Sequence, residues 1–254
     1  MMPNKNMPIY RVLPLSFLLL LWEIAVRLNN KWIFFFGMPS KIETYFVIKM
    51  LNGTLPVDFA ITFFEAATGF IMGNLFGILL GITLWQSRNI FLIARPYIIA
   101  LGSAPIFALA PLFIIWFGTG IFSKIMIATF STFFVALFQA HTGASEVKDE
   151  YISLMQTFGA TKNQIFRKII APSSIVWVVS AFRMNVSFAI LGAFIGEFIS
   201  SNKGLGHLIL VASGLFDISL VLCGIFMLML MALIFNYIIS ISEAPLKKIV
   251  VKYL

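Results

Sequence analysis

Charged side chains and cysteine are scarce in this chain. Of its 254 residues, 11% are charged and 60% are hydrophobic, and cysteine occurs once, at Cys223. A soluble domain carries about 25% charged and 45–50% apolar residues, so the composition excludes an ordinary soluble domain. The mean hydropathy of +0.99 agrees. A single thiol also excludes an intramolecular disulfide and leaves the redox compartment open.

Sequence patterns for catalysis, metal binding and nucleotide binding are missing as well. No Gly-x-x-x-x-Gly-Lys-Ser/Thr loop is present, so we expect neither ATP nor magnesium on this chain. The histidines, His141 and His207, belong to no ligand cluster, and we expect no metal site. Ser213 lacks the glycine that usually precedes a nucleophilic serine by two positions. These observations disfavour an intramembrane protease, and we expect a chain that is not an enzyme.

Long apolar runs are the main feature of the sequence. A helix needs about 20 apolar residues to cross roughly 30 Å of hydrocarbon, and an open sheet would leave backbone groups unpaired in lipid. The sequence therefore predicts an all-α, polytopic membrane protein that forms a single transmembrane domain over residues 1–254. About six spans are expected, at residues 11–28, 59–84, 92–116, 121–140, 171–200 and 216–241. The first run lacks a small-residue cleavage pattern, so we expect a retained helix rather than a signal peptide.

Lysine and arginine are distributed unevenly between the predicted connecting segments, and an excess of them marks the cytoplasmic side of a membrane protein. With the N-terminus inside, the inner segments hold Lys5, Arg11, Arg88, Arg95, Lys148, Lys162, Arg167, Lys168, Lys247, Lys248 and Lys252, and the outer segments hold Lys31, Lys41, Lys49, Lys124 and Lys203. We therefore predict a multi-pass protein of the cell membrane with both termini in the cytoplasm. The formal charge of +8 is explained by these loops, and we expect no nucleic-acid partner.

Glycine and proline mark the second and third predicted spans. Glycines recur every four residues on one face of the second span, at Gly69, Gly73, Gly77 and Gly81, and such a face lets another helix backbone approach closely. The third span contains Pro105 and Pro111, and proline removes a backbone donor and disturbs the preceding turn. We expect a kinked or broken helix there, which either borders a transport pathway or serves packing only.

Two ionisable residues lie within or near the fifth span, and such groups often mark functional positions in membranes. Arg183 either faces a pathway for an anionic solute or pairs with Glu65 or with helix-end carbonyls. Glu197 is a candidate for the pathway or its outer gate. The two residues are fourteen positions apart, or about 21 Å along one helix, so they cannot both contact one small ligand. In the first span, Glu23 and Arg27 are spaced to pair with each other.

The longest polar segment, residues 141–170, is predicted to hold two short helices. Acidic residues open the first helix, Ile152, Met155 and Phe158 recur at three-residue intervals, and Gly159 stands at its expected end. Thr161 and Gln164 have the spacing of a capping box for a second helix. An amphipathic helix in this place either lies on the lipid surface or docks into a partner protein. The acidic start of the first helix favours a protein partner.

This segment resembles the cytoplasmic signature loop of ATP-binding-cassette importer permeases of the binding-protein-dependent type. That loop has a Glu-Ala-Ala element, three intervening residues, a glycine, nine further residues and then Ile-x-Leu-Pro at the re-entry into the membrane. Here Phe158-Gly159-Ala160 is followed at the proper spacing by Ile169-Ile170-Ala171-Pro172, whereas Ser153-Leu154-Met155 replaces Glu-Ala-Ala. Further motifs resemble the branch that serves nitrate, sulfonate, taurine and thiamine-precursor uptake: Ala104-Pro105, Ala110-Pro111-Leu112, Trp116-Phe117-Gly118-Thr119-Gly120, Gly196-Glu197-Phe198 and Gly204-Leu205-Gly206.

The resemblance implies a permease that works with other chains. It implies a second permease copy, an ATPase subunit that binds ATP and magnesium, and an extracytoplasmic solute-binding protein. The ATPase-coupling residues would be Ile152, Ser153, Leu154, Met155, Phe158, Gly159 and Ala160, and the pathway or gate would include Pro105, Pro111, Arg183 and Glu197. The solute would be a small polar compound, such as an anion or a vitamin precursor. The alternative is a secondary carrier or a channel, for which the sequence offers neither an internal repeat nor a filter-like segment.

Overall fold

The computed structural model describes residues 7–29 and 31–253, and the side chains of residues 7–12, 15 and 244–253 lie outside the described part. Within these residues the regular secondary structure consists of helices, which turns and short loops connect. The helices are α1 (Met7–Leu28), α2 (Lys31–Phe36), α3 (Pro39–Leu51), α4 (Thr54–Trp85), α5 (Arg88–Gly102), α6 (Ile106–Phe117), α7 (Ile121–Ser145), α8 (Asp149–Thr157), α9 (Lys162–Ile165), a π-helical turn η1 (Phe166–Ile170), α10 (Ala171–Ile199), α11 (Leu205–Gly214) and α12 (Ile218–Tyr253).

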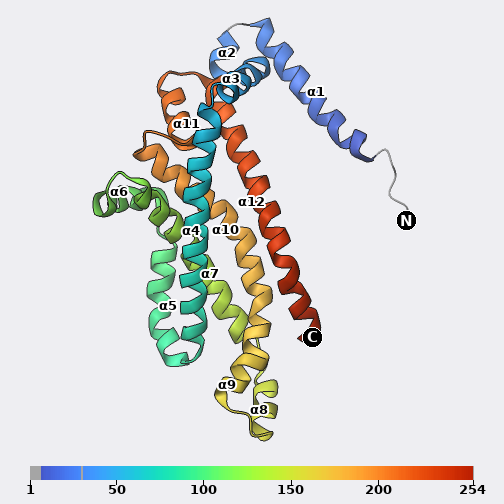
Figure 1. Cartoon of the computed structure of the whole chain (residues 1–254), viewed down its shortest axis with the longest axis vertical. Coiled ribbons are helices and arrows are strands. Elements are labelled where there is room, and N and C mark those ends of the chain that lie inside the picture. Colours follow the sequence, from blue (N-terminus) through green and yellow to red (C-terminus); the bar gives the residue numbers. More distant parts are fainter. Residues whose placement is uncertain (1–6, 30, 254) are drawn as a thin grey trace.

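Four helices are long and apolar enough to cross a membrane: α4, α7, α12 and the continuous helix that runs from α9 through α10. They lie side by side along the long axis of the molecule (Figure 1). Together with the pair α5 and α6, they correspond to the last five predicted spans. The all-α membrane fold is therefore confirmed. The first predicted span forms most of α1, which stands away from the bundle in Figure 1. As far as its described residues go, α1 is not among the candidate spans.

The third predicted span, 92–116, is not one straight helix. Helices α5 and α6 meet at an angle of 93°, and the break lies at Ser103, Ala104 and Pro105. Pro105 is the N-cap residue of α6, where its missing N–H costs no helical hydrogen bond. Pro96 and Pro111 instead lie inside continuous helices. A broken helix was expected from the prolines, and the structure assigns the break to Pro105 alone.

Helix α4 packs on α7 through its glycines. Gly69, Gly73, Gly77 and Gly81 are all buried. A Cβ atom built at any of them would collide with the α7 backbone or with small α7 side chains such as Ala128, Thr132, Ala136 and Ala140. In lipid the hydrophobic effect does not drive helix association, so this close backbone approach supplies much of the packing energy. The structure thus places the glycine face directly against another helix.

Buried polar groups join α4, α7 and α10 near the middle of the bundle. Asn185 of α10 donates to the Asn74 side chain at 2.8 Å and to the Thr132 carbonyl at 3.0 Å. Asn74 also donates to the Phe70 carbonyl at 2.7 Å. Interhelical hydrogen bonds of this kind add to packing in a membrane. Helix α12 joins α4 through aromatic contacts, because Phe235 packs against both Phe63 and Phe70.

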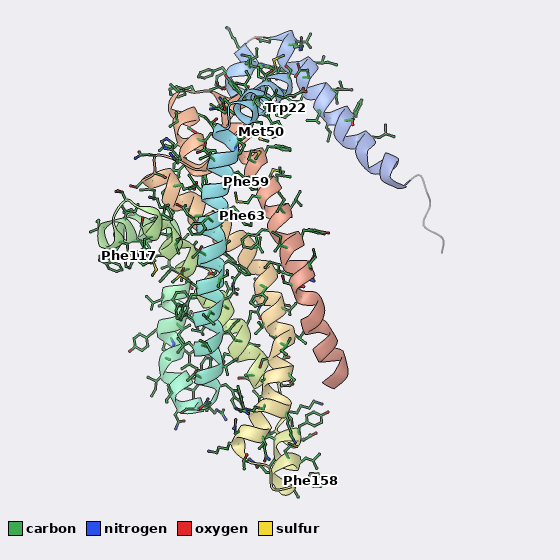
Figure 2. All side chains as sticks on the ribbon, in the orientation of Figure 1. Trp22, Met50, Phe59, Phe63, Phe117 and Phe158 are labelled. Carbon is green, nitrogen blue, oxygen red and sulfur yellow. The ribbon has the colours of Figure 1, made fainter. Side chains whose placement is uncertain are left out.

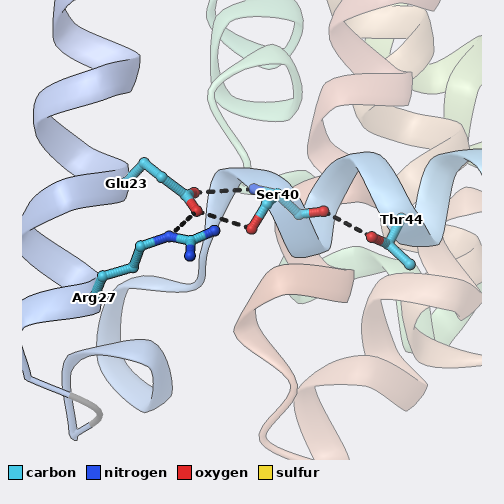
Figure 3. A network of polar contacts seen from close by, with 4 residues as sticks. All are labelled: Glu23, Arg27, Ser40 and Thr44. Atoms are coloured by element: carbon cyan, nitrogen blue, oxygen red, sulfur yellow. Dashed lines mark hydrogen bonds and ion pairs between the residues drawn. The ribbon is translucent and has the colours of Figure 1, made fainter.

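The N-terminal helices are attached to the bundle by polar contacts at one end. Glu23 of α1 accepts hydrogen bonds from Arg27 at 2.7 Å and from the Ser40 hydroxyl and backbone N–H at 2.9 and 3.1 Å (Figure 3). The expected Glu23–Arg27 pair is therefore present, and it also caps the first turn of α3. Tyr45 of α3 donates to Asp217 at 2.5 Å, and this hydrogen bond raises the pKa of Tyr45 above its usual value.

The packing of the glycine face can be tested by whether replacing glycine with alanine lowers or raises the stability of the protein. Alanine normally stabilises a helix by about 1 kcal/mol relative to glycine. The double variant Gly73→Ala/Gly77→Ala should instead lower the thermal unfolding midpoint of the detergent-purified protein, because overpacking costs about 1–3 kcal/mol per site. The control is Gly120→Ala/Gly214→Ala, since a Cβ at either position meets no atom within 4 Å. An unchanged or raised midpoint in the first variant would contradict the proposed packing.

Candidate functional site

The polar segment between α7 and α10 forms a projecting helical end. Helix α7 continues to Ser145, five residues into the predicted loop 141–170, and α8 then spans Asp149–Thr157. The second predicted short helix is not separate. It begins at Lys162 and runs without interruption through η1 into α10. Helices α8 and α9 extend beyond the ends of the neighbouring helices (Figure 1), so this segment is accessible to a partner.

Helix α8 ends at a glycine for a conformational reason. Gly159 has φ +78°, a left-handed conformation that residues with a Cβ adopt poorly. Its N–H donates to the Gln156 carbonyl at 2.9 Å, and the N–H of Ala160 donates to the Met155 carbonyl at 3.0 Å. These two bonds form a Schellman motif, which satisfies the last carbonyls of the helix. No atom lies within 4 Å of a Cβ built at Gly159, so the requirement for glycine comes from the backbone and not from crowding.

The next helix begins with the capping box expected from the sequence. The Thr161 hydroxyl accepts from the Gln164 N–H at 3.3 Å, and the Thr161 N–H donates to the Gln164 side chain at 2.8 Å. Because both ends of the short turn 158–161 are fixed in this way, α8 is held at a defined angle to α10.

The apolar residues of α8 divide between two faces. Ile152 and Met155 pack into a cluster with Ala144, Ile165 and Ile170 of the same chain. Phe158 and Leu154 point outward, with 78% and 54% of their surface exposed, and Phe158 lies at the tip of the projecting segment (Figure 2). Of the predicted coupling residues, Ile152 and Met155 are thus partly buried against their own chain, whereas Leu154 and Phe158 are exposed.

At the other end of the bundle, side chains from α4 and α10 hold the start of α11. Glu197 is fully buried and accepts from the Thr62 hydroxyl and the Gly206 N–H, both at 2.7 Å. The Leu205 N–H donates to Thr62 at 2.9 Å, and the Gly204 N–H donates to Asp58 at 2.8 Å. The first N–H groups of a helix have no partner within it. Here these three groups are satisfied by side chains of other helices, which fixes where α11 begins.

A buried lysine completes this polar cluster. Lys124 of α7 is 2% exposed and donates to the carbonyls of Thr119 and Gly120. Its ammonium group also interacts electrostatically with the carboxyl groups of Glu65 and Glu197. Both glutamates are buried, so each of α4, α7 and α10 contributes one buried ionisable group. A buried charge is tolerated only when it is paired or hydrogen-bonded. Lys124 and Glu197 meet that condition through their hydrogen bonds, whereas Oε2 of Glu65 has no hydrogen-bond partner among the described residues.

Sequence reasoning missed the role of Lys124. It was assigned to an outer segment, but α7 begins at Ile121 and places it in the first turn of the helix, against the buried Gly196 of α10. The apolar residues on both sides of Lys124 were the available signal. Glu197 lies near the end of α10 that leads into α11, and its hydrogen bonds connect α10 with α4 and α11.

Arg183 pairs with a residue that the sequence did not suggest. Its guanidinium donates to the Glu243 carboxylate of α12 at 2.7 to 3.2 Å. The expected alternatives, Glu65 and helix-end carbonyls, are therefore corrected to Glu243. Sequence spacing could not reveal this pair, since the residues are 60 positions apart and meet only because α10 and α12 run alongside each other.

These features together describe a polytopic helical membrane protein with a close-packed core, a polar cluster at one end and an exposed short helix at the other. The model of the family described as "Binding-protein-dependent transport system inner membrane component" matches residues 73–248. The chain belongs to this family. It is the transmembrane permease subunit of an ATP-binding-cassette importer.

Named relatives agree with the family. The chain is 30% identical over 233 residues to the riboflavin transport system permease protein RibX of Chloroflexus aurantiacus. That match covers 91% of this chain and 87% of RibX. The chain is also 29% identical over 191 residues to the formylaminopyrimidine transport permease protein ThiX of Halalkalibacterium halodurans, and that match covers 75% of each protein.

A solved structure shares the fold. An inward-facing structure of the MetNI methionine ABC transporter has a TM-score of 0.58 at 18% identity, and the match covers 82% of this chain and 98% of that one.

The role of the Glu197 carboxylate in holding the start of α11 can be tested by removing its hydrogen-bond acceptors. Glu197→Ala should lower stability by about 1–3 kcal/mol for each buried group left unpaired, measured as the unfolding midpoint in detergent. The Thr62 hydroxyl and the Gly206 N–H donate to different oxygens of Glu197. Glu197→Gln keeps one acceptor oxygen, which can serve the Gly206 N–H, so it should lose less than Glu197→Ala. Glu43→Ala, at an exposed carboxylate of α3, is the control. Equal midpoints for Glu197→Ala and Glu43→Ala would show that the cluster does not hold α11.

Proposed function

We propose that this permease takes up a small polar solute and that α8 is the element through which a separate ATPase subunit drives it. The observation that carries the proposal is the exposure of Leu154 and Phe158 on a rigidly capped helix at the projecting end of the bundle. Large apolar side chains exposed at a helix tip are costly in water and are typical of anchors that enter a groove on a partner.

The remaining partners follow from the same proposal. ATP and magnesium bind the ATPase and not this chain, a second copy of the permease completes the pathway, and an extracytoplasmic binding protein delivers the solute. Membership in a binding-protein-dependent family supports these assignments. The broken α5–α6 pair at Pro105 and the cluster around Glu197 belong to the outer part of the pathway in this proposal, whereas Arg183 has a structural role through Glu243.

The solute is proposed by class only. Relatives are named for formylaminopyrimidine, riboflavin, aliphatic sulfonates and taurine, and these compounds share small size and polar groups more than any one charge. We propose a small polar compound, either an anion such as nitrate, a sulfonate or taurine, or a vitamin or its precursor.

Coupling through α8 can be tested at Gly159 without touching a contact residue. Gly159→Val should abolish stimulation of ATP turnover by the partner ATPase, because a β-branched residue resists positive φ and the end of α8 would shift. Gly159→Asn should retain most of it, since asparagine tolerates this conformation. The readout is ATP turnover of the reconstituted complex. Full stimulation by Gly159→Val, or transport with no ATPase present, would contradict the proposal.

The exposed anchors provide a second test. Phe158→Asp should weaken copurification of the ATPase at least tenfold, because an interface anchor typically contributes about 2 kcal/mol or more. Asn163→Asp, an equally small charge change at an exposed position of α9, should leave copurification unchanged. Wild-type recovery of the ATPase with Phe158→Asp would show that α8 does not dock through this side chain.

Orientation can be tested with two exposed lysines. In a Cys223→Ser background, Lys203→Cys should react with a membrane-impermeant maleimide added to intact cells, and Lys162→Cys should react only after the cells are opened. The excess of positive residues on the side of Lys162 gives this direction. Labelling of Lys162→Cys from outside would reverse the proposed topology.

A further inference from the structure

A cavity of about 590 Å³ lies between the inner ends of α7 and α10 and the start of α8. Its wall includes Lys148, Lys168, Tyr151, Ser173, Trp177 and Glu146. The exposed edge of α8 does not form it, because Leu154 and Phe158 do not line it. Its volume falls within the roughly 300–1,000 Å³ of small-ligand sites.

The cavity carries unneutralised positive charge. Lys148 comes from the turn before α8 and Lys168 from η1, so two separate segments bring their side chains to one wall. Within residues 7–29 and 31–253, no carboxylate forms an ion pair with either ammonium group. Glu146 also lines the cavity, but its carboxylate accepts a hydrogen bond from the Trp177 indole N–H at 2.9 Å. Two ammonium groups against one carboxylate leave the lining with a net positive charge, which suits an anion.

The tryptophan gives the cavity an apolar wall at a defined place. Trp177 lies in the second turn of α10, and a Cβ added at Gly143 of α7 would come within 2.8 Å of its side chain. Glycine at this position therefore lets the indole lie directly against α7. Tryptophan is enriched where a transmembrane helix leaves the hydrocarbon for the headgroup region. Val176 and Ile169 extend the same apolar surface.

We propose that this cavity binds the phosphate headgroup of an anionic phospholipid from the inner leaflet. Lys148 and Lys168 contact the phosphate, the hydroxyl groups of Ser173 and Tyr151 are in place to donate to it, and the acyl chains pass along Trp177 and Val176 into the bilayer. Basic pockets between helices at the cytoplasmic surface bind anionic headgroups in this way. The bound lipid would brace the turn between α7 and α8. The inference rests on the proposed inside orientation of residues 141–170, but not on coupling to an ATPase.

The test is native mass spectrometry of the purified full-length chain, with phosphatidylglycerol or phosphatidylcholine of the same acyl chains added in turn. The wild type should retain phosphatidylglycerol several-fold better. Lys148→Gln/Lys168→Gln should reduce retained phosphatidylglycerol roughly tenfold. The matched control is Lys162→Gln/Arg167→Gln, which removes two exposed charges from the same segment outside the cavity, and it should behave as the wild type.

Three results would overturn the inference. The cavity is not the site if the Lys148/Lys168 variant retains the lipid, or if the control loses it equally. Equal retention of both lipids by the wild type would exclude a preference for anionic headgroups. Displacement of phosphatidylglycerol by 10 mM inorganic phosphate would assign the cavity to a soluble phosphate instead of a lipid. Because no ATPase is present, these results are independent of the coupling proposal.

Discussion

The close approach of α4 to α7 is the contact on which the rest of the structure depends. Four glycines at four-residue spacing bring the two backbones together, and α10 then packs against both, with Asn185 bonded to Asn74 and Thr132. In lipid such a core cannot rely on the hydrophobic effect, so small residues and buried hydrogen bonds supply its specificity. A larger side chain on the glycine face would displace every element that α4 and α7 position.

The two ends of this core hold different features, a polar cluster at one end and the segment with α8 at the other. At the outer end of the proposed topology, Lys124 of α7 and Glu197 of α10 fix the turn before α7 and the start of α11. At the inner end, the same two helices lead into the segment that presents α8. Packed side chains, hydrogen-bond networks and rigid helices can all carry energetic coupling between distant sites. The structure thus links the proposed docking helix to the outer cluster through continuous helices.

Periodicity and spacing predicted most of the fold, whereas side-chain partners were less accessible. The apolar runs located the bundle helices, and the capping box at Thr161 was readable because caps are local. The Arg183–Glu243 pair could not be predicted, since it joins two helices far apart in the sequence. Likewise, residues at three-residue intervals identified an apolar face on α8, but only the structure shows that Ile152 and Met155 pack against the same chain and that Phe158 is exposed.

In the proposed transporter, the exposed edge of α8, and not the face that packs on its own chain, meets the ATPase. Site-specific photocrosslinking tests this directly, with a benzophenone amino acid placed at position 158 or at position 155 of the assembled transporter. We expect a crosslinked product with the ATPase from position 158 and little or none from position 155, because Met155 packs against its own chain. A product from position 155 with none from position 158 would contradict the account.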